Sequence, residues 1–338
     1  MQDNNEPHPA KHLRRVRAKL IFNPGAGDAG ASSMQMMDVI RELQDWKFVP
    51  EAFLVEAGCD LPGAVQEALA EGIRMFVVCG GDGTVTSVAG MLAGERATLG
   101  IIPTGTQNNT ARSLSIPTDI PAAIALMRTG RRIKIDTGVA TSRSPDGAGG
   151  EISTPFLELC SVGLVSKLFP STDDVQHGNL ARVGDFVTAL VTSPPAEMHL
   201  VLDGKHKVNA LGHVVLVSNM PYFGRHYKIG PDNAYRDGML DVLFFADLSK
   251  LDLMNYVFRG VGVDLWEDPR IQHYRVRRIE IDTQPAMPIM VDGNPLQDGW
   301  VRVEVRRRVL TVMADEPTPA ALTDPGAINK AETDAATE

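Results

Sequence analysis

The sequence has few cysteines and few aromatic residues, and it contains no long hydrophobic run. Its three cysteines, Cys59, Cys79 and Cys160, are far apart and show no CxxC spacing, which argues against a disulfide framework and against a cysteine zinc site. No apolar run reaches the roughly 18 residues that a membrane-spanning helix needs, and residues 1–15 lack the apolar core of a secretory signal. These absences predict a cytoplasmic protein whose thiols are buried and reduced.

The formal net charge of -9 argues against general binding of nucleic acid. Three local basic clusters nevertheless stand out, at Lys11–Lys19, at Arg128–Lys134, and at Arg275, Arg277 and Arg278. A run of charges most often forms a solvated face, and the alternative is contact with anionic lipid headgroups.

The chain of 338 residues is long enough for two domains. From residue 19 to residue 135, short apolar runs alternate with helical patterns, which is typical of a mostly parallel sheet covered by helices. Strands are expected at 19–23, 50–56, 75–79 and 98–103, and helices at 32–46, 61–72, 84–94 and 110–116. In such sheets ligands bind beyond the carboxyl ends of the strands.

From residue 136 to residue 314 the pattern becomes strand-like, which predicts a second, mainly antiparallel domain. Strands are expected at 135–142, 154–163, 198–204, 212–220, 239–247, 276–283, 287–293 and 300–314, a hairpin turn at 203–205, and helices at 179–191 and 250–261. Residues 1–18 form a basic N-terminal extension. Residues 315–338 are acidic and without apolar periodicity, so they are predicted to be a disordered tail.

Three of the strand ends in the first domain carry glycine and small polar residues. They are "NPGAG" (Asn23–Gly27), "CGGDGT" (Cys79–Thr84) and "PTGTQNN" (Pro103–Asn109). In a parallel sheet all three open on the same edge. Glycines there let backbone amides approach an anion, and a following helix N-terminus adds a favourable dipole, so the loops predict a cradle for the phosphates of a nucleotide.

Polar side chains in these loops complete the predicted cradle. Thr84 and Thr106 offer hydroxyls to phosphate oxygens, and Asn108 offers an amide. Asp82 suits a phosphate site only if a cation lies between them, and Mg²⁺ bridges carboxylates and phosphate oxygens in this way. For the first loop alone, with Asn23, an ordinary tight turn is an adequate explanation.

At these residues the sequence resembles the diacylglycerol kinase catalytic-domain family, which includes bacterial lipid kinases and sphingosine kinases. The resemblance is carried by "IFNPGAG", "VVCGGDGTVTSVAGML", "LGIIPTGTQNNTARSLSIP", "DNAYRDGMLDVLFF" and "MVDGNPL". It implies a nucleotide-binding α/β domain of the NAD kinase/diacylglycerol kinase type, followed by a β-sandwich domain, with ATP in the cleft between them. The expected nucleotide-binding residues are Asn23, Gly25, Gly27, Gly80, Gly81, Asp82, Gly83, Thr84, Thr86, Thr106 and Asn108.

In bacterial members, the aspartate of an Asp-Gly-x-Leu segment holds a structural magnesium ion together with nearby carbonyls. The matching segment here is "DGML". Carried over, the resemblance implies a metal site formed by Asp237 and the carbonyls of Ala234 and Met239.

The chain departs from the family pattern in three places. Asn108 and Asn109 stand where the family usually has Asn-Asp, and Asp28 stands where many bacterial members have a lysine. Asp292-Gly293-Asn294 replaces the family's Asp-Gly-Glu, whose carboxylates serve the acceptor hydroxyl. Asp292 is then the remaining candidate base, and its alternative role is that of a hairpin turn residue.

The resulting hypothesis is an ATP-dependent lipid kinase that uses Mg²⁺, with Asp82 and Asp292 as catalytic residues. The acceptor would be the hydroxyl of diacylglycerol, ceramide or a sphingoid base, reached by peripheral docking on an anionic membrane surface. Two alternatives stay open. One is an enzyme of the NAD kinase type with a soluble substrate, and the other is a nucleotide-binding regulator that lost catalysis with the missing glutamate. No motif in the sequence predicts an oligomeric state.

Overall fold

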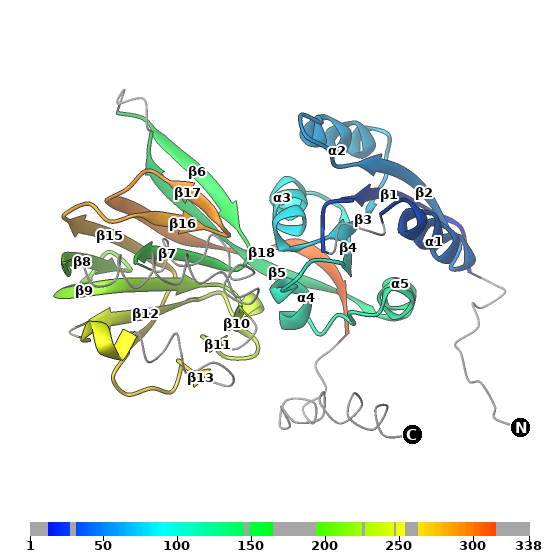
Figure 1. Ribbon diagram of the computed structural model, residues 1–338. Helices are drawn as coiled ribbons and strands as arrows, with labels where there is room; N and C mark the ends of the chain where they lie inside the picture. Colours follow the sequence, from blue (N-terminus) through cyan, green and yellow to red (C-terminus); the bar gives the residue numbers. More distant parts are fainter. Residues whose placement is uncertain are drawn as a thin grey trace, which may run out of the picture.

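The computed structural model describes residues 13–27, 32–144, 149–164, 194–224, 227–246, 248–253 and 263–315. They form two domains side by side (Figure 1). Most of the basic N-terminal extension, Asp28, the helix expected at 179–191, most of the helix expected at 250–261 and the tail after residue 315 lie outside the described residues.

The first domain has a parallel sheet of four strands in the order β2-β1-β3-β4. These are β1 (Val16–Phe22), β2 (Phe48–Leu54), β3 (Met75–Gly80) and β4 (Thr98–Pro103). Every residue of β3 and β4 is buried, because helices cover both faces of the sheet. This burial explains why the two strands are continuous apolar runs in the sequence.

Five helices lie on this sheet: α1 (Ser32–Asp45), α2 (Leu61–Ala70), α3 (Asp82–Leu92), α4 (Asn109–Ser113) and α5 (Ile120–Thr129). One face of the sheet packs against α1 and α5, and the other packs against α2, α3 and α4. The sequence analysis did not predict α5. Its signal was present, because Asp119 caps the helix by accepting from the amide of Ala122, and a proline stands in the first turn.

The second domain is a mostly antiparallel β-sandwich around its own apolar core. Its longer strands are β5 (Arg131–Arg143), β6 (Glu151–Phe156), β7 (Leu159–Gly163), β8 (Ala196–Leu202), β9 (His206–Ser218), β12 (Leu240–Ala246), β14 (Gln272–Val276), β15 (Arg278–Gln284) and β18 (Trp300–Ala314). The short strands are β10 (Tyr222–Phe223), β11 (Tyr227–Lys228), β13 (Val263–Asp264), β16 (Ile289–Val291) and β17 (Asn294–Leu296). The turn predicted at 203–205 is confirmed, since Asp203 and Gly204 both have positive φ between β8 and β9.

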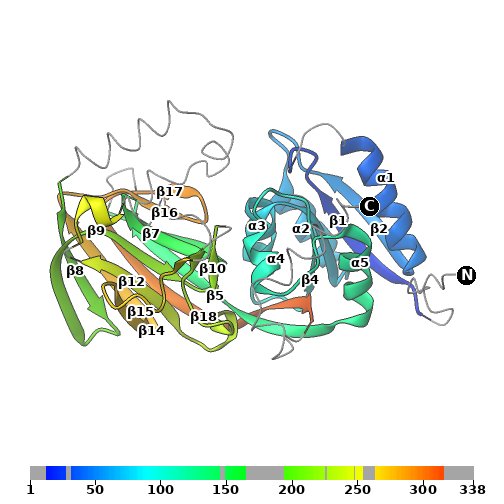
Figure 2. The same ribbon diagram turned by 60° about the horizontal axis from the view of Figure 1, so that its bottom comes forward.

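Two long strands, β5 and β18, run from one domain into the other (Figure 2). They pair from Val301 opposite Ser142 to Ala314 opposite Arg131, and Val312 also pairs in parallel with Leu99 of β4. The last residues of β18 therefore belong to the core of the first domain. The domain boundary predicted between residues 135 and 136 lies inside β5.

The strand predicted at 154–163 is divided into β6 and β7. Leu157 and Glu158 stand between the two strands. The backbone amides of Leu157, Glu158 and Leu159 donate to the carboxylate of Asp292 instead of continuing a ladder. This interruption turns the chain at Glu158 toward the first domain.

Candidate active site

The structure brings the three glycine-containing loops together at the carboxyl edge of the parallel sheet. The side-chain amide of Asn23 donates to the Thr84 hydroxyl at 2.8 Å, and the amide of Thr104 donates to the Gly80 carbonyl at 3.1 Å. Gly27 has a φ of +75°, and a β-carbon there would lie 2.4 Å from the Thr104 carbonyl oxygen. Contacts between the loops therefore explain part of their glycine content.

Gly81 and Gly105 also bring two of these loops into close contact. A β-carbon added to Gly105 would lie 2.5 Å from the α-carbon of Gly81, which no side chain tolerates. Gly83 is different, because it is exposed and has open space beside it. Gly81 is the N-cap of α3, and Gly83 lies in its first turn. Because Gly81 has no side chain to cap the helix, the first backbone amides of α3 remain suited to bind a phosphate anion.

Asp82 connects two of the loops. Its carboxylate accepts from the backbone amides of Asn109 at 3.0 Å and Thr110 at 3.1 Å, and it thereby caps α4. The side chain of Asn108 is engaged within its own loop, since it accepts from the Gly105 amide and donates to the Gly105 carbonyl. The amide donor predicted for phosphate binding at Asn108 is thus used in folding the loop, while Thr106 is exposed.

Thr86 was predicted to contact the nucleotide, and in the structure its side chain faces the second domain. Its buried hydroxyl donates to Asp292 of the second domain at 3.0 Å. In this arrangement Thr86 holds the two domains together.

The carboxylate of Asp292 accepts from four donors. They are the amides of Leu157 at 2.8 Å, Glu158 at 3.1 Å and Leu159 at 2.8 Å, and the Thr86 hydroxyl. Four donors match the roughly four lone-pair positions of a carboxylate. Burial raises the pKa of Asp292, and these hydrogen bonds oppose the rise.

Asp292 also occupies a hairpin turn, as its alternative role predicts. Asp292 and Gly293 have φ values of 42° and 82° between β16 and β17. Asn294, at the position of the family's glutamate, is exposed, and its amide donates weakly to the Asp292 carbonyl at 3.4 Å.

Glu158 is a charged residue of the site that the sequence analysis did not predict. Its carboxylate accepts from the side-chain amide of Asn109 at 3.0 Å and from the Thr110 hydroxyl at 2.9 Å. Only 7% of the residue is exposed. Burial raises the pKa of Glu158 well above its usual range, and the nearby carboxylates of Asp82 and Asp292 raise it further. The available signal was a single acid inside the apolar run "FLELCSV", because an unpaired buried charge is costly.

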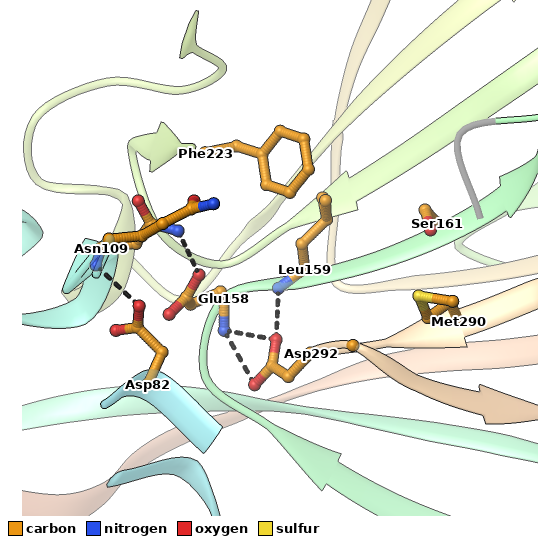
Figure 3. Close-up of a pocket in the computed structure, with 10 residues that line it drawn as sticks. Asp82, Asn109, Glu158, Leu159, Ser161, Phe223, Met290 and Asp292 are labelled. Carbon is orange, nitrogen blue, oxygen red and sulfur yellow. Dashed lines mark hydrogen bonds between the residues drawn. The ribbon is translucent and has the colours of Figure 1, made fainter. Parts of the chain in front are cut away.

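A cavity of about 150 Å³ lies where these groups meet (Figure 3). Carboxyl groups of both domains lie on one side of it, and apolar side chains lie on the other. It is lined by Asp82, Gln107, Asn109, Glu158, Leu159, Ser161, Phe223, Met290, Asp292 and Gly293. The cavity can hold the polar end of a molecule that is apolar elsewhere.

The predicted structural metal site already contains a cation of the chain itself. The guanidinium of Arg275 is paired with the Asp237 carboxylate, and its Nε lies 3.3 Å from the carboxylate of the buried Asp241. The other Asp237 oxygen accepts from the amide of Met239 at 2.9 Å, and the Ala234 carbonyl accepts from the Asp237 amide at 3.5 Å. In this arrangement the residues do not fit a magnesium ion.

At the cavity, Asp82 can contribute to a metal site only in part. No three His, Cys, Asp or Glu side chains among the described residues are placed to hold a metal ion together. Mg²⁺ in kinases is held by one or two carboxylates together with phosphate oxygens, and Asp82 beside the phosphate cradle fits that pattern.

Some arginines of the basic clusters predicted to contact anionic lipid instead make contacts within the chain. Arg275 pairs with Asp237, and Arg278 pairs with Glu280. Arg128 donates to the carbonyl of Arg14. No helix in the described part of the chain is both long and apolar enough to cross a membrane.

Comparison with known proteins agrees with the division into an α/β domain and a β-sandwich domain. Residues 17–140 match the model of the diacylglycerol kinase catalytic domain, and residues 169–314 match that of the YegS C-terminal NAD kinase beta sandwich-like domain. The chain belongs to the diacylglycerol kinase catalytic-domain family. Family membership identifies it as a kinase in the broad sense.

Individual members of the diacylglycerol kinase family are distant from this chain. The diacylglycerol kinases of Staphylococcus carnosus and Bacillus subtilis are each 25% identical to it, over 82% of this chain and 89% of the relative. Among solved structures, a putative diacylglycerol kinase from Bacillus anthracis is 23% identical, with a TM-score of 0.69 over 90% of this chain and 98% of that one. Yeast NADH kinase complexed with NADH is 11% identical, with a TM-score of 0.53 over 90% of this chain and 85% of that one. These two structures bear on the fold alone, and they agree with the α/β and β-sandwich domains predicted from the sequence.

Proposed function

We propose that the protein transfers the γ-phosphoryl group of ATP to the hydroxyl of a lipid bound at the domain boundary. The observation that carries this proposal is the two-sided cavity. Its carboxyl side is formed by Asp82 and Glu158 next to the phosphate cradle, and its apolar side by Leu159, Phe223 and Met290. A diacylglycerol, ceramide or sphingoid base has this same division between a hydroxyl end and an apolar body.

The parts of the site divide the work of phosphoryl transfer. The uncapped N-terminus of α3 and the amides of Gly81 and Gly83 would bind the phosphates. Mg²⁺ bound at Asp82 would neutralise charge on the transferred group. Asp292 holds residues 157–159 in place and positions the acceptor side of the cavity. Positioning of this kind supplies much of the rate enhancement in phosphoryl transfer.

A lipid acceptor requires contact with a membrane surface, and we propose that this cytoplasmic enzyme docks peripherally on anionic lipid. Exposed Arg132 of these basic clusters is a candidate for this contact. The protein is expected to sediment with vesicles containing anionic lipid at low salt and to leave them at high salt. Sedimentation that is equal with neutral vesicles would refute the electrostatic part of the proposal.

The function is tested by incubating the full chain with labelled ATP, Mg²⁺ and a panel of acceptors. The panel contains diacylglycerol, ceramide, sphingosine and, as a soluble competitor, NAD. Labelled lipid is the expected product, and Asp82→Asn should abolish it because the metal and α4 both depend on this carboxylate. Labelled NADP would instead support the NAD kinase alternative. ATP binding without any transfer would support the non-catalytic regulator.

A further inference from the structure

The polar side chains that line the cavity differ in what they can still offer to a ligand. The carboxylates of Asp82 and Asp292 accept hydrogen bonds from backbone amides of the chain. The side-chain amide of Asn109 donates to Glu158. Gln107 also lines the cavity, and its carboxamide makes no hydrogen bond to any residue that the structure describes. Gln107 therefore keeps both its N–H donors and its carbonyl acceptor for a ligand.

Gln107 stands where the polar side of the cavity meets the apolar side. It precedes Asn108 and Asn109 in the loop, and the backbone amide of Asn109 donates to Asp82. Its side-chain oxygen reaches the second domain, where it lies 3.8 Å from the point that a β-carbon on Gly224 would occupy. The residue before Gly224 is Phe223, which belongs to the apolar side of the cavity (Figure 3). A lipid whose hydroxyl lies among the carboxyl groups would thus pass Gln107 before its apolar chains begin.

Building on the proposed function, we infer that Gln107 determines substrate specificity by binding the acyl carbonyl of the lipid acceptor. In diacylglycerol an ester stands on the carbon next to the one that carries the hydroxyl, and in ceramide an amide stands at the same place. The carbonyl oxygen of either lipid needs a hydrogen-bond donor inside the cavity, because a buried polar group without a partner is costly. The side-chain amide of Gln107 supplies this donor.

The same carbon distinguishes the acylated lipids from other acceptors that also have an apolar body. A sphingoid base carries an amine there, and a dialkylglycerol carries an ether oxygen. Neither of them offers a carbonyl to the Gln107 amide. The class of acceptor is therefore an acylated lipid alcohol, such as diacylglycerol or ceramide.

The first test compares dioctanoylglycerol with its dioctyl ether, which keeps the hydroxyl and the chain length but lacks both carbonyls. Gln66→Leu, on the exposed side of α2, is the matched control for Gln107→Leu. One neutral hydrogen bond changes affinity by about two- to tenfold. We expect Gln107→Leu to raise the KM for dioctanoylglycerol by this factor, with kcat nearly unchanged, and not to raise the KM for the ether. Gln66→Leu should behave as the wild type with both lipids.

The second test distinguishes an ester from an amide at the acyl linkage. Gln107→Glu keeps the shape of the side chain and replaces the donor with a carboxylate. The ester of dioctanoylglycerol has no N–H, so its KM should rise at least as much as in Gln107→Leu. A short-chain ceramide has an amide N–H that the carboxylate can accept, so its KM should rise less. Equal rises for the two lipids would contradict a contact between residue 107 and the acyl linkage.

Binding measured without turnover separates this inference from the proposed function. The full chain is titrated calorimetrically with each lipid in the presence of Mg²⁺ and a non-hydrolysable ATP analogue. The wild type should bind dioctanoylglycerol more tightly than the ether, and Gln107→Leu should lose this difference. The same result in a protein that transfers no phosphoryl group to any lipid would refute the proposed function and leave the inference standing.

Other outcomes overturn the inference. Phosphoryl transfer with equal changes of KM for dioctanoylglycerol and its ether in Gln107→Leu would refute it, and so would a wild type that prefers sphingosine to both acylated lipids. Binding of no lipid at all would refute both the inference and the proposed function. The melting temperature of each variant shows whether it is folded. If Gln107→Leu is unfolded, Gln107→Glu gives the same comparison of ester and ether.

Discussion

The side-chain amide of Asn109 donates a hydrogen bond to the carboxylate of Glu158 across the domain boundary, at 3.0 Å. Asp82, on the first domain, binds the backbone of the same α4 residues that Glu158 binds through side chains. The start of α4 is therefore held by one acid from each domain. A change at any of these positions acts on the nucleotide loops and on the cavity at once.

Glu158 makes the stability of the protein depend on pH. Its pKa is raised in the folded state, while in the unfolded chain it is about 4.3. The stability that this group contributes is complete below about pH 4.3 and is lost as pH rises through the folded-state pKa. In thermal melts, the difference in melting temperature between Glu158→Gln and the wild type should therefore move in favour of Glu158→Gln as pH is raised from about 5 to 8. An equal difference at every pH would contradict the raised pKa.

The hydrogen bond between Thr86 and Asp292 should contribute to both stability and activity. Thr86→Val removes the donor and leaves a buried carboxylate with one partner fewer, which costs about 1–3 kcal/mol. Urea denaturation should show this loss, and turnover should fall because the two domains are held less firmly. Thr86→Ser keeps the hydroxyl and serves as the control. Identical stability of the Val and Ser variants would show that the hydrogen bond contributes nothing.

Arg275 should make a structural metal ion unnecessary at Asp237. EDTA is therefore expected to leave the melting temperature of the nucleotide-free protein unchanged. Arg275→Met should destabilise the fold by about 2 kcal/mol, because Asp241 is fully buried and loses its guanidinium, although Arg275 itself is partly exposed. Arg41→Met, which breaks an exposed pair within α1, is the control and should cost less than about 0.5 kcal/mol. A saturable rise in wild-type melting temperature with Mg²⁺ would contradict this prediction.

The contact between Gly81 and Gly105 should be required for nucleotide binding. Gly105→Ala forces a β-carbon to within 2.5 Å of the Gly81 backbone and should separate the two loops. We expect a stability loss of about 1–3 kcal/mol and weaker ATP binding in a titration monitored by calorimetry. Gly83→Ala, where a β-carbon meets open space, should leave stability unchanged. Unaltered ATP affinity in Gly105→Ala would show that the loops do not need this contact.

Most of the first domain could be predicted from the sequence because its signals are local. The strands β3 and β4 are apolar runs that end in glycine loops, and the loops meet because parallel strands end on one edge. The helix α5 was missed although Asp119 marks its start. The domain boundary was placed inside β5 because the pairing of β18 with β4 joins residues far apart in the chain.

The candidate site was predicted less completely, because its decisive contacts are long-range. Asp292 was recognised as a site residue, but its four donors come from residues 86 and 157–159, and no local pattern gives that set. Glu158 was not recognised because it stands within an apolar run that resembles one continuous strand. Its role depends on the break between β6 and β7, which Asp292 produces from more than a hundred residues away.

The pairing of β5 with β18 also sets the order in which the protein can fold during synthesis. The core of the first domain includes Leu310, Val312 and Ala314, which leave the ribosome after nearly all of the second domain. The edge of the parallel sheet next to β4 consequently stays open until residues 310–314 have been made. Most of the first domain is therefore synthesised before the second domain, but its core is complete only after β18 has been added. Until then the unpaired edge of β4 is open to aggregation.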